Sequence, residues 1–182
     1  MARASLFPLL IAAALAGCGN SAPETGPFAP GVARGEGVDP MLVGHRLMAA
    51  GEYELAVQSF SRAALDRGMD AEVLTGIGSA YLGLGRLGQA ESLLRDAIDK
   101  DETSPEAWNN LGVVLMERGE VAEAAQVFRR AYAIDNGESD SIRDNLRLAL
   151  AKMENPVYDQ DPEQDYKVVR RGSSDFLIRK IP

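Results

Sequence analysis

The feature that most constrains this chain is a repeat with a period of 34 residues. Three glycines, Gly51, Gly85 and Gly119, lie one period apart. The same spacing relates four further sets of residues: Gly44, Gly78 and Gly112; Ala56, Ala90 and Ala124; Phe60, Leu94 and Phe128; Ala63, Ala97 and Ala131. This period is typical of a helix–turn–helix repeat. Such repeats stack into a superhelix with a concave binding surface, so the spacing favours a binding module over an enzyme.

The first 17 residues predict a signal peptide. Arg3 gives the start a positive charge, and the run from Leu6 to Leu15 is apolar except for a break at Pro8. This run is too short to span a bilayer and has the length of the apolar core of a secretory signal. We therefore expect export from the cytoplasm.

The end of this run, Leu15-Ala16-Gly17-Cys18, resembles the lipobox of bacterial lipoproteins, in which the cysteine is lipidated. Cys18 is the only cysteine in the chain, so it has no partner for an intramolecular disulfide. The resemblance implies a lipid anchor at Cys18, and the absence of Asp at Gly19 implies sorting to the outer membrane, facing the periplasm. The alternative is an ordinary signal peptide followed by a free cysteine.

The rest of the chain divides into three parts. Residues 18–37 are rich in Gly, Pro, Ala and Ser and predict a flexible tether with a typical span of about 25 Å. Residues 38–154 predict a helical domain, and residues 155–182 a C-terminal tail.

Capping signals place seven helices in the domain. Asp39, Asp70 and Ser104 are plausible N-caps, and Pro follows two of them at the first helical position. The expected helices cover about residues 40–50, 52–67, 71–84, 87–100, 105–118, 120–134 and 139–153.

These positions reproduce a known repeat pattern. The third copy is carried by Trp108, Leu111, Gly112, Ala124, Phe128 and Ala131. The second copy is carried by Leu74, Ile77, Gly78, Tyr81, Ala90, Leu94 and Ala97, and a weaker first copy by Gly44, Ala56, Phe60 and Ala63. They resemble the tetratricopeptide repeat, although Gly68, Glu102 and Asn136 replace its late Pro. The resemblance implies an all-α helix–turn–helix solenoid of about three repeats, closed by the helix at 139–153.

In this family the first helix of each pair lines the concave face, which makes that face the expected protein-binding site. The predicted binding residues are Met41, His45, Met48, Thr75, Ser79, Leu82, Asn109, Val113 and Met116. The methionines would give an adaptable apolar floor, with acidic residues toward one end. The alternative is that some of these apolar side chains belong to the core. If the floor is open, replacing Met48 and Met116 with Glu should abolish binding and leave the helices intact.

The expected ligand is an extended or helical peptide with apolar anchors and a basic flank. Relatives that clamp a C-terminal carboxylate use Lys and Arg on the concave face. The second and third repeats have neither there, which disfavours such a clamp.

Two short runs in the tail have β character: Tyr166 to Val169 and Phe176 to Ile181. The favoured interpretation of residues 155–182 is a frayed terminus. The alternative is a segment that orders on a partner, by strand addition or through its basic end.

The sequence offers little for catalysis. His45 is the only histidine, and no cysteine or acidic pair accompanies it at metal-ligand spacing. We therefore expect no enzyme activity, no metal and no cofactor. The net charge of −8 also argues against binding nucleic acid.

Together these features predict a membrane-anchored periplasmic scaffold that binds a protein client. By resemblance the nearest class is the small tetratricopeptide lipoproteins of pilus and secretion machines, including the tight-adherence pilus lipoprotein and the pilotins, with a secretin or pilus-assembly component as client. The alternative is an envelope scaffold for cell-wall or outer-membrane assembly enzymes.

Overall fold

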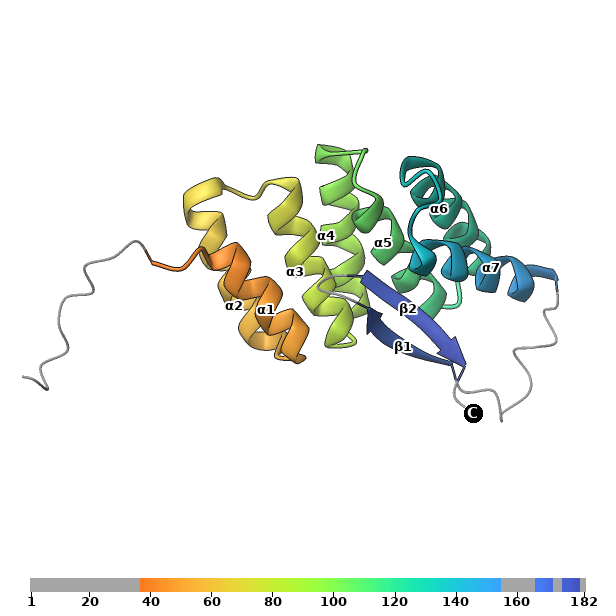
Figure 1. The fold of residues 1–182 in the computed structure, drawn as a ribbon, viewed down its shortest axis with the longest axis horizontal. Helices are drawn as coiled ribbons and strands as arrows, with labels where there is room; N and C mark the ends of the chain where they lie inside the picture. Colours follow the sequence, from red (N-terminus) through yellow and green to blue (C-terminus); the bar gives the residue numbers. More distant parts are fainter. Residues whose placement is uncertain (1–36, 155–165, 172–174, 181–182) are drawn as a thin grey trace, which may run out of the picture. The chain divides into compact units, whose positions relative to one another are not determined.

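The computed structural model describes residues 37–154, 166–171 and 175–180 (Figure 1). The expected signal peptide, Cys18 and all but the last residue of the expected tether lie outside the described residues. Residues 38–182 form one compact unit, to which residues 1–37 do not belong.

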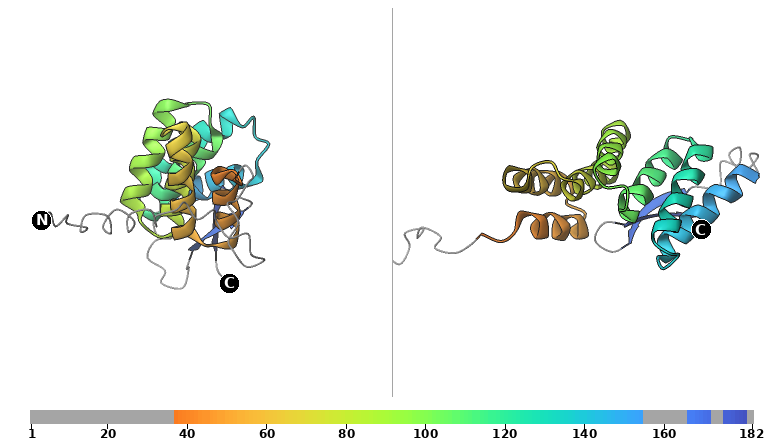
Figure 2. Two further views of the ribbon diagram at one scale, coloured as in Figure 1. Left: turned by 90° about the vertical axis from the view of Figure 1, so that its left-hand side faces the viewer. Right: turned by 90° about the horizontal axis from the view of Figure 1, so that it is seen from above.

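Seven α-helices make up most of this unit. Their bounds are α1 Pro40–Ala50, α2 Tyr53–Arg67, α3 Ala71–Gly83, α4 Leu87–Lys100, α5 Pro105–Glu117, α6 Val121–Ile134 and α7 Asp140–Glu154. Each boundary lies within two residues of the one expected from the sequence. Consecutive helices pack against each other along the chain, from α1 on α2 to α6 on α7 (Figures 1 and 2).

The first helix of each pair begins at a side-chain cap. The carboxylate of Asp39 accepts a hydrogen bond from the backbone N–H of Met41, and that of Asp70 accepts one from Val73. The hydroxyl of Ser104 caps α5 in the same way. These caps satisfy backbone donors that the first turn of a helix leaves without a partner, which explains why the helices begin where the sequence places them.

The three equally spaced glycines form identical turns within the helix pairs. Gly51, Gly85 and Gly119 have φ of 79°, 70° and 80°, a left-handed conformation that favours glycine. The residue after each glycine donates its N–H back to the preceding helix; the Glu52 N–H, for example, lies 2.9 Å from the Leu47 carbonyl oxygen. Each turn therefore ends the first helix of its pair and directs the chain into the second.

Packing within each pair depends on a second glycine. A Cβ placed on Gly44 would lie 2.4 Å from the ring of Phe60, and one on Gly112 would lie 2.5 Å from the ring of Phe128. Both rings are fully buried. The first helix thus leaves a space that a large side chain of the second helix fills, and the two helices approach closely.

The fold class expected from the sequence is confirmed. The repeats share one buried cluster, which runs from Met41 in α1 to Ala149 in α7 and continues into the C-terminal strands. Helix α7 closes the series by packing on α6, as expected for a capping helix. Among the described residues, no helix is both long enough and apolar enough to cross a bilayer.

The expectation of a frayed terminus is wrong for two segments of the tail. Strands β1 Tyr166–Arg171 and β2 Asp175–Lys180 pair in antiparallel register, with Val168 opposite Ile178. Strand β2 packs against α5 and α7, so these strands belong with the helices (Figure 2). A hairpin of two strands is marginally stable alone in water, and the apolar contacts described below explain its order.

Replacing Gly112 with Ala should destabilise the protein by about 1–3 kcal/mol, because the added methyl group would overlap the buried ring of Phe128. The control is Gly88→Ala in α4, where a new Cβ meets no atom within 4 Å. Urea unfolding followed by circular dichroism should show a lower midpoint only for Gly112→Ala. Equal midpoints for the two variants would contradict the packing described here.

Candidate functional site

The first helices of the pairs, α1, α3 and α5, together with α7, form one face of the helical array, which we call the inner face. The C-terminal hairpin lies against it. Strand β2 contacts α5 and α7, and Arg170 on β1 donates a hydrogen bond of 2.5 Å to the carbonyl oxygen of Ala49 at the end of α1. The face expected to bind a protein client therefore holds a segment of the same chain.

The structure buries most of the binding residues expected from the sequence. Eight of the nine are at most 6% exposed: Met41, Met48, Thr75, Ser79, Leu82, Asn109, Val113 and Met116. Only His45 remains partly exposed. This burial argues against the expectation that Glu at Met48 and Met116 leaves the helices intact, because a carboxylate at either position would lose its hydration inside the core.

Four buried polar residues connect α3, α5 and α7 beneath the hairpin. The amide of Asn110 donates to the hydroxyl of Ser79 at 2.8 Å, and the amide of Asn109 donates to the Asn110 carbonyl at 3.2 Å. The amide of Asn145, on α7, donates to the Asn109 carbonyl at 2.9 Å. Each hydrogen bond fixes the orientation of the next amide, so the network holds the side-chain amides of Asn109 and Asn145 in a defined orientation.

The side-chain amides of Asn145 and Asn109 bind the backbone of β2. The side-chain carbonyl of Asn145 accepts the N–H of Ile178 at 3.1 Å, and its NH₂ donates to the carbonyl of Phe176 at 2.7 Å. Asn109 also donates to the Phe176 carbonyl, at 3.3 Å. Because these two backbone groups lie two residues apart on one edge of a strand, the Asn145 amide pairs with β2 much as a neighbouring strand would.

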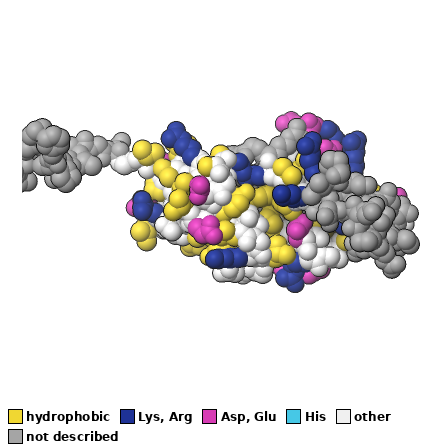
Figure 3. Space-filling view, turned by 90° about the horizontal axis from the view of Figure 1, so that it is seen from below, with side chains coloured by type: hydrophobic (Ala, Val, Ile, Leu, Met, Phe, Trp, Pro, Cys, Tyr) yellow, Lys and Arg dark blue, Asp and Glu magenta, His cyan; other side chains and the backbone are white. Residues whose placement is uncertain are grey.

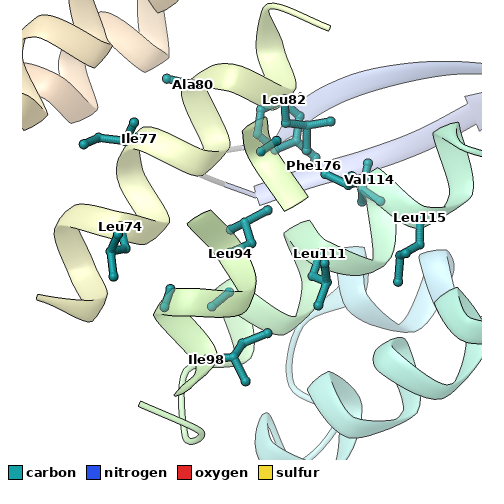
Figure 4. Close-up of a cluster of buried hydrophobic side chains, with 14 of the residues drawn as sticks. Leu74, Ile77, Ala80, Leu82, Leu94, Ile98, Leu111, Val114, Leu115 and Phe176 are labelled. Carbon is teal, nitrogen blue, oxygen red and sulfur yellow. The ribbon is translucent and has the colours of Figure 1, made fainter. Parts of the chain in front are cut away.

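Apolar contacts accompany these backbone contacts. Phe176 is 2% exposed and Ile178 is 7% exposed, and both belong to the same buried cluster as Leu82 and Val114. Figure 4 shows Phe176 in this cluster, near Leu82 and Val114. Residues two apart on a strand point to the same face, so both side chains are directed into the helices. The inner face therefore recognises an extended segment in two ways, through its backbone and through alternate apolar side chains.

A pocket of about 390 Å³ opens among α1, α3, α5 and the turn that precedes α5. It is lined by His45, Ala71, Glu72, Thr75, Asp101, Ser104 and Glu106. Two of these residues, His45 and Thr75, are expected binding residues, and three others carry carboxylates. The pocket thus has the acidic character that the sequence predicted toward one end of the site, and it suits a positively charged side chain.

His45 packs edge-on against Phe60 with ring centroids 5.2 Å apart, and its Nδ1 atom is buried with no hydrogen-bond partner among the described residues. Partial burial raises the pKa of Glu117, and the nearby charge of Lys152 opposes this shift. On the face shown in Figure 3, acidic and basic side chains are interspersed among hydrophobic ones. Within the described part of the chain, no group of three metal-ligating side chains occurs.

Sequence reasoning found Asn109 but missed Asn110, Asn145, Phe176 and Ile178. One signal was available for Asn145. It lies between Ile142 and Ala149 at helical spacing, so a polar amide occupies a buried position on an otherwise apolar face. The contact with the tail gave no sequence signal, because Asn109 and Phe176 are 67 residues apart.

Comparison with known protein families identifies the repeats. The family model described as "Tetratricopeptide repeat" matches residues 44–105 and 75–139, which together span more than half of the chain. Human tetratricopeptide repeat protein 7B is 42% identical over 52 residues, or 29% of this chain and 6% of that protein. Human tetratricopeptide repeat protein 7A is 29% identical over 85 residues, or 47% of this chain and 10% of that protein. The chain spans a tenth or less of the length of these relatives.

Solved structures show the same fold at low sequence identity. The Sgt2 TPR domain from Aspergillus fumigatus has a TM-score of 0.62 at 22% identity, covering 74% of this chain and 90% of that domain. The second TPR domain of human RPAP3, in complex with the HSP70 peptide SGPTIEEVD, has a TM-score of 0.55 at 22% identity, covering 62% of this chain and 93% of that domain.

Replacing Asn145 with Ala should free the hairpin from the inner face, because the Ile178 N–H loses its acceptor and the Phe176 carbonyl loses its closer donor. We expect a stability loss of about 1–3 kcal/mol and faster hydrogen exchange at the Ile178 amide. A comparison variant, Asn110→Ala, loses the bonds to Ser79 and Asn109 but no direct contact to β2, so exchange at Ile178 should rise less than in the Asn145 variant. Hydrogen exchange followed by NMR checks this, and unchanged exchange at Ile178 in the Asn145 variant would contradict the assigned contact.

Proposed function

The chain belongs to the tetratricopeptide repeat family, and we propose that it is a scaffold that binds a protein client on the inner face. The proposed scaffold is anchored to a membrane and faces the periplasm, where it assists assembly or localisation of a pilus or secretion complex. The single observation that carries this proposal is that the inner face already holds an extended polypeptide. Asn145 binds the backbone of β2, and the helices bury Phe176.

The acidic pocket supports a client with a basic flank. The RPAP3 domain is in complex with an HSP70 peptide whose sequence, SGPTIEEVD, contains three acidic residues. The pocket in this chain carries Glu72, Asp101 and Glu106, which would repel such a peptide. A segment with Lys or Arg next to apolar anchors has the complementary charge.

The proposed anchor gives the scaffold its place in the cell. Acyl chains on Cys18 would hold the protein at the periplasmic face of the outer membrane, since several chains on one residue bind a membrane stably. The segment between Cys18 and α1 would act as a tether that lets the helices reach a client near the membrane. The scaffold would then raise the local concentration of that client where assembly occurs.

A second candidate function uses the same site with a different client. An envelope scaffold for cell-wall or outer-membrane assembly enzymes would need the same anchor and the same inner face. The two functions differ in the identity of the captured protein, which the second experiment below determines.

Replacing Cys18 with Ser should move the protein from the membrane fraction to the soluble fraction, because the proposed acyl attachment site is lost. The measurement is fractionation of cells that produce each form, together with metabolic labelling by a fatty-acid analogue. Label and membrane association that persist in the variant would refute the anchor and leave the inner face unaffected.

Affinity capture from solubilised envelopes with residues 38–182 should recover a secretin or pilus-assembly subunit. We expect the pocket variant Glu72→Lys/Glu106→Lys to capture at least about tenfold less of this client than the wild type, because charge reversal repels a basic flank. The control is Glu54→Lys/Glu123→Lys, which makes the same charge change in the first turns of α2 and α6. Glu123 pairs with Arg95 as Glu72 pairs with Arg67, so the loss of an ion pair is also matched.

Three outcomes separate the candidate functions. A pilus or secretion component that the control retains and the pocket variant loses supports the proposal. Recovery of cell-wall enzymes with the same dependence supports the second candidate. Capture that is the same for both variants excludes the pocket as part of the binding site.

A further inference from the structure

We propose that the inner face is a receptor for β-strands, that its ligand is an extended segment with large apolar residues at alternate positions, and that the C-terminal hairpin is a built-in competitor that such a client displaces. This inference rests on the proposed function in one respect, that the inner face binds a protein client. It adds the chemical class of the client and the control of access to the site.

The backbone contacts define the first part of the ligand class. Asn145 and Asn109 bind the carbonyl of Phe176, and Asn145 also binds the N–H of Ile178. Any extended segment presents, on one edge, the carbonyl of one residue and the N–H of the residue two positions later, whatever its side chains. The other member of the network, Asn110, is held by Ser79, so the amides are oriented by the helices themselves. The receptor is therefore organised independently of the hairpin sequence.

The apolar contacts define the second part. Phe176 and Ile178 are buried in the cluster shared by α3, α5 and β2; Leu177, which separates them, is also buried but lies outside this cluster. A client strand with a large apolar residue at each of these two positions would fill the same space. A helical client presents no free backbone edge, because its N–H and carbonyl groups bond within the helix. This favours a strand over the helical alternative that the sequence left open.

The nature of the hairpin makes displacement feasible. It consists of two strands, and such a unit has little stability of its own in water, so its order depends on the inner face. As part of the same chain, it competes at an effective concentration on the order of millimolar. A client at lower concentration must bind more tightly than the hairpin, which sets a threshold for binding.

Charge also favours docking of the hairpin. Lys167, Arg170 and Arg179 lie on its strands, whereas acidic residues outnumber basic ones in residues 38–154. Exposed charge attraction weakens as salt increases. Occupancy by the hairpin should therefore fall at high ionic strength, and a client strand with basic residues would reproduce the same attraction.

The experiment uses residues 38–182, a compact unit that contains every core residue in the part of the chain that the structure describes. The probe is a fluorescein-labelled peptide with the sequence of residues 166–180. The variant Phe176→Asp removes the buried anchor of the resident hairpin without altering any residue of the helices. The control Val169→Asp introduces the same charge at an exposed position on the partner strand. Fluorescence anisotropy measures the affinity of each protein for the peptide.

We expect Phe176→Asp to bind the peptide at least about tenfold more tightly than the wild type, because apparent affinity rises as the fraction of open sites rises. Val169→Asp should remain close to the wild type. A peptide N-methylated at the Ile178 amide lacks the donor to Asn145 and should bind Phe176→Asp at least about tenfold more weakly. Adding Asn145→Ala should remove this difference between the two peptides.

The proposal is overturned if Phe176→Asp stays folded by circular dichroism and gains no affinity, or if the N-methylated peptide binds as well as the unmodified one. It is also overturned if the wild type forms a dimer with exchanged hairpins, because a second copy is then the occupant.

A second measurement covers the case in which Phe176→Asp does not fold. A protease site is inserted between residues 154 and 166 of the otherwise wild-type protein, and cleavage releases the hairpin from its covalent link. Replacement of the cleaved hairpin by the labelled peptide supports the proposal, and permanent retention of the hairpin overturns it. These assays use purified components only and do not depend on the identity of the client. The strand-receptor proposal and the proposed function can therefore fail independently of each other.

Discussion

The contact between a glycine of the first helix and a large side chain of the second is the constraint on which the rest of the structure depends. At Gly44 and Gly112 any side chain would occupy the space that Phe60 and Phe128 fill. At Gly78 the same role falls to Leu94, whose Cγ atom would lie 2.9 Å from an added Cβ. The large side chain is Phe in two repeats and Leu in the other, and in all three it packs against a glycine of the first helix. Each helix pair requires a space on the first helix and a side chain of the second helix that fills it.

This close approach determines which surfaces remain for function. Each pair buries its small residues internally, and the first helices of successive pairs come together on the inner face. Ser79, Asn109, Asn110 and Asn145 lie there in a buried position, where a polar group without a partner would be costly. They satisfy one another and the backbone of β2. A polar network inside an apolar array thus serves two purposes, since it connects three helices and it binds an extended chain.

The hairpin changes how the binding face should be understood. An open groove with a methionine floor would bind by adaptable apolar contact, whereas the observed face has Met48 and Met116 in the core. Specific binding there comes from oriented amides and from two apolar positions on a strand. An acidic pocket lies on this face, lined by residues of α1, α3 and α5 and of the turn that precedes α5.

The sequence by itself determined the repeats, the helix boundaries and the fold class. These depend on local signals, namely caps such as Asp70, turns that require glycine, and apolar residues at a fixed period. Only the tertiary structure decided that the tail pairs with itself and lies on the inner face. That contact joins Asn145 to residues 31 and 33 positions away, and no local pattern specifies such a pairing. The expected binding residues lie on α1, α3 and α5, and eight of the nine are buried there, which depends on tertiary packing that a pattern local to one helix does not specify.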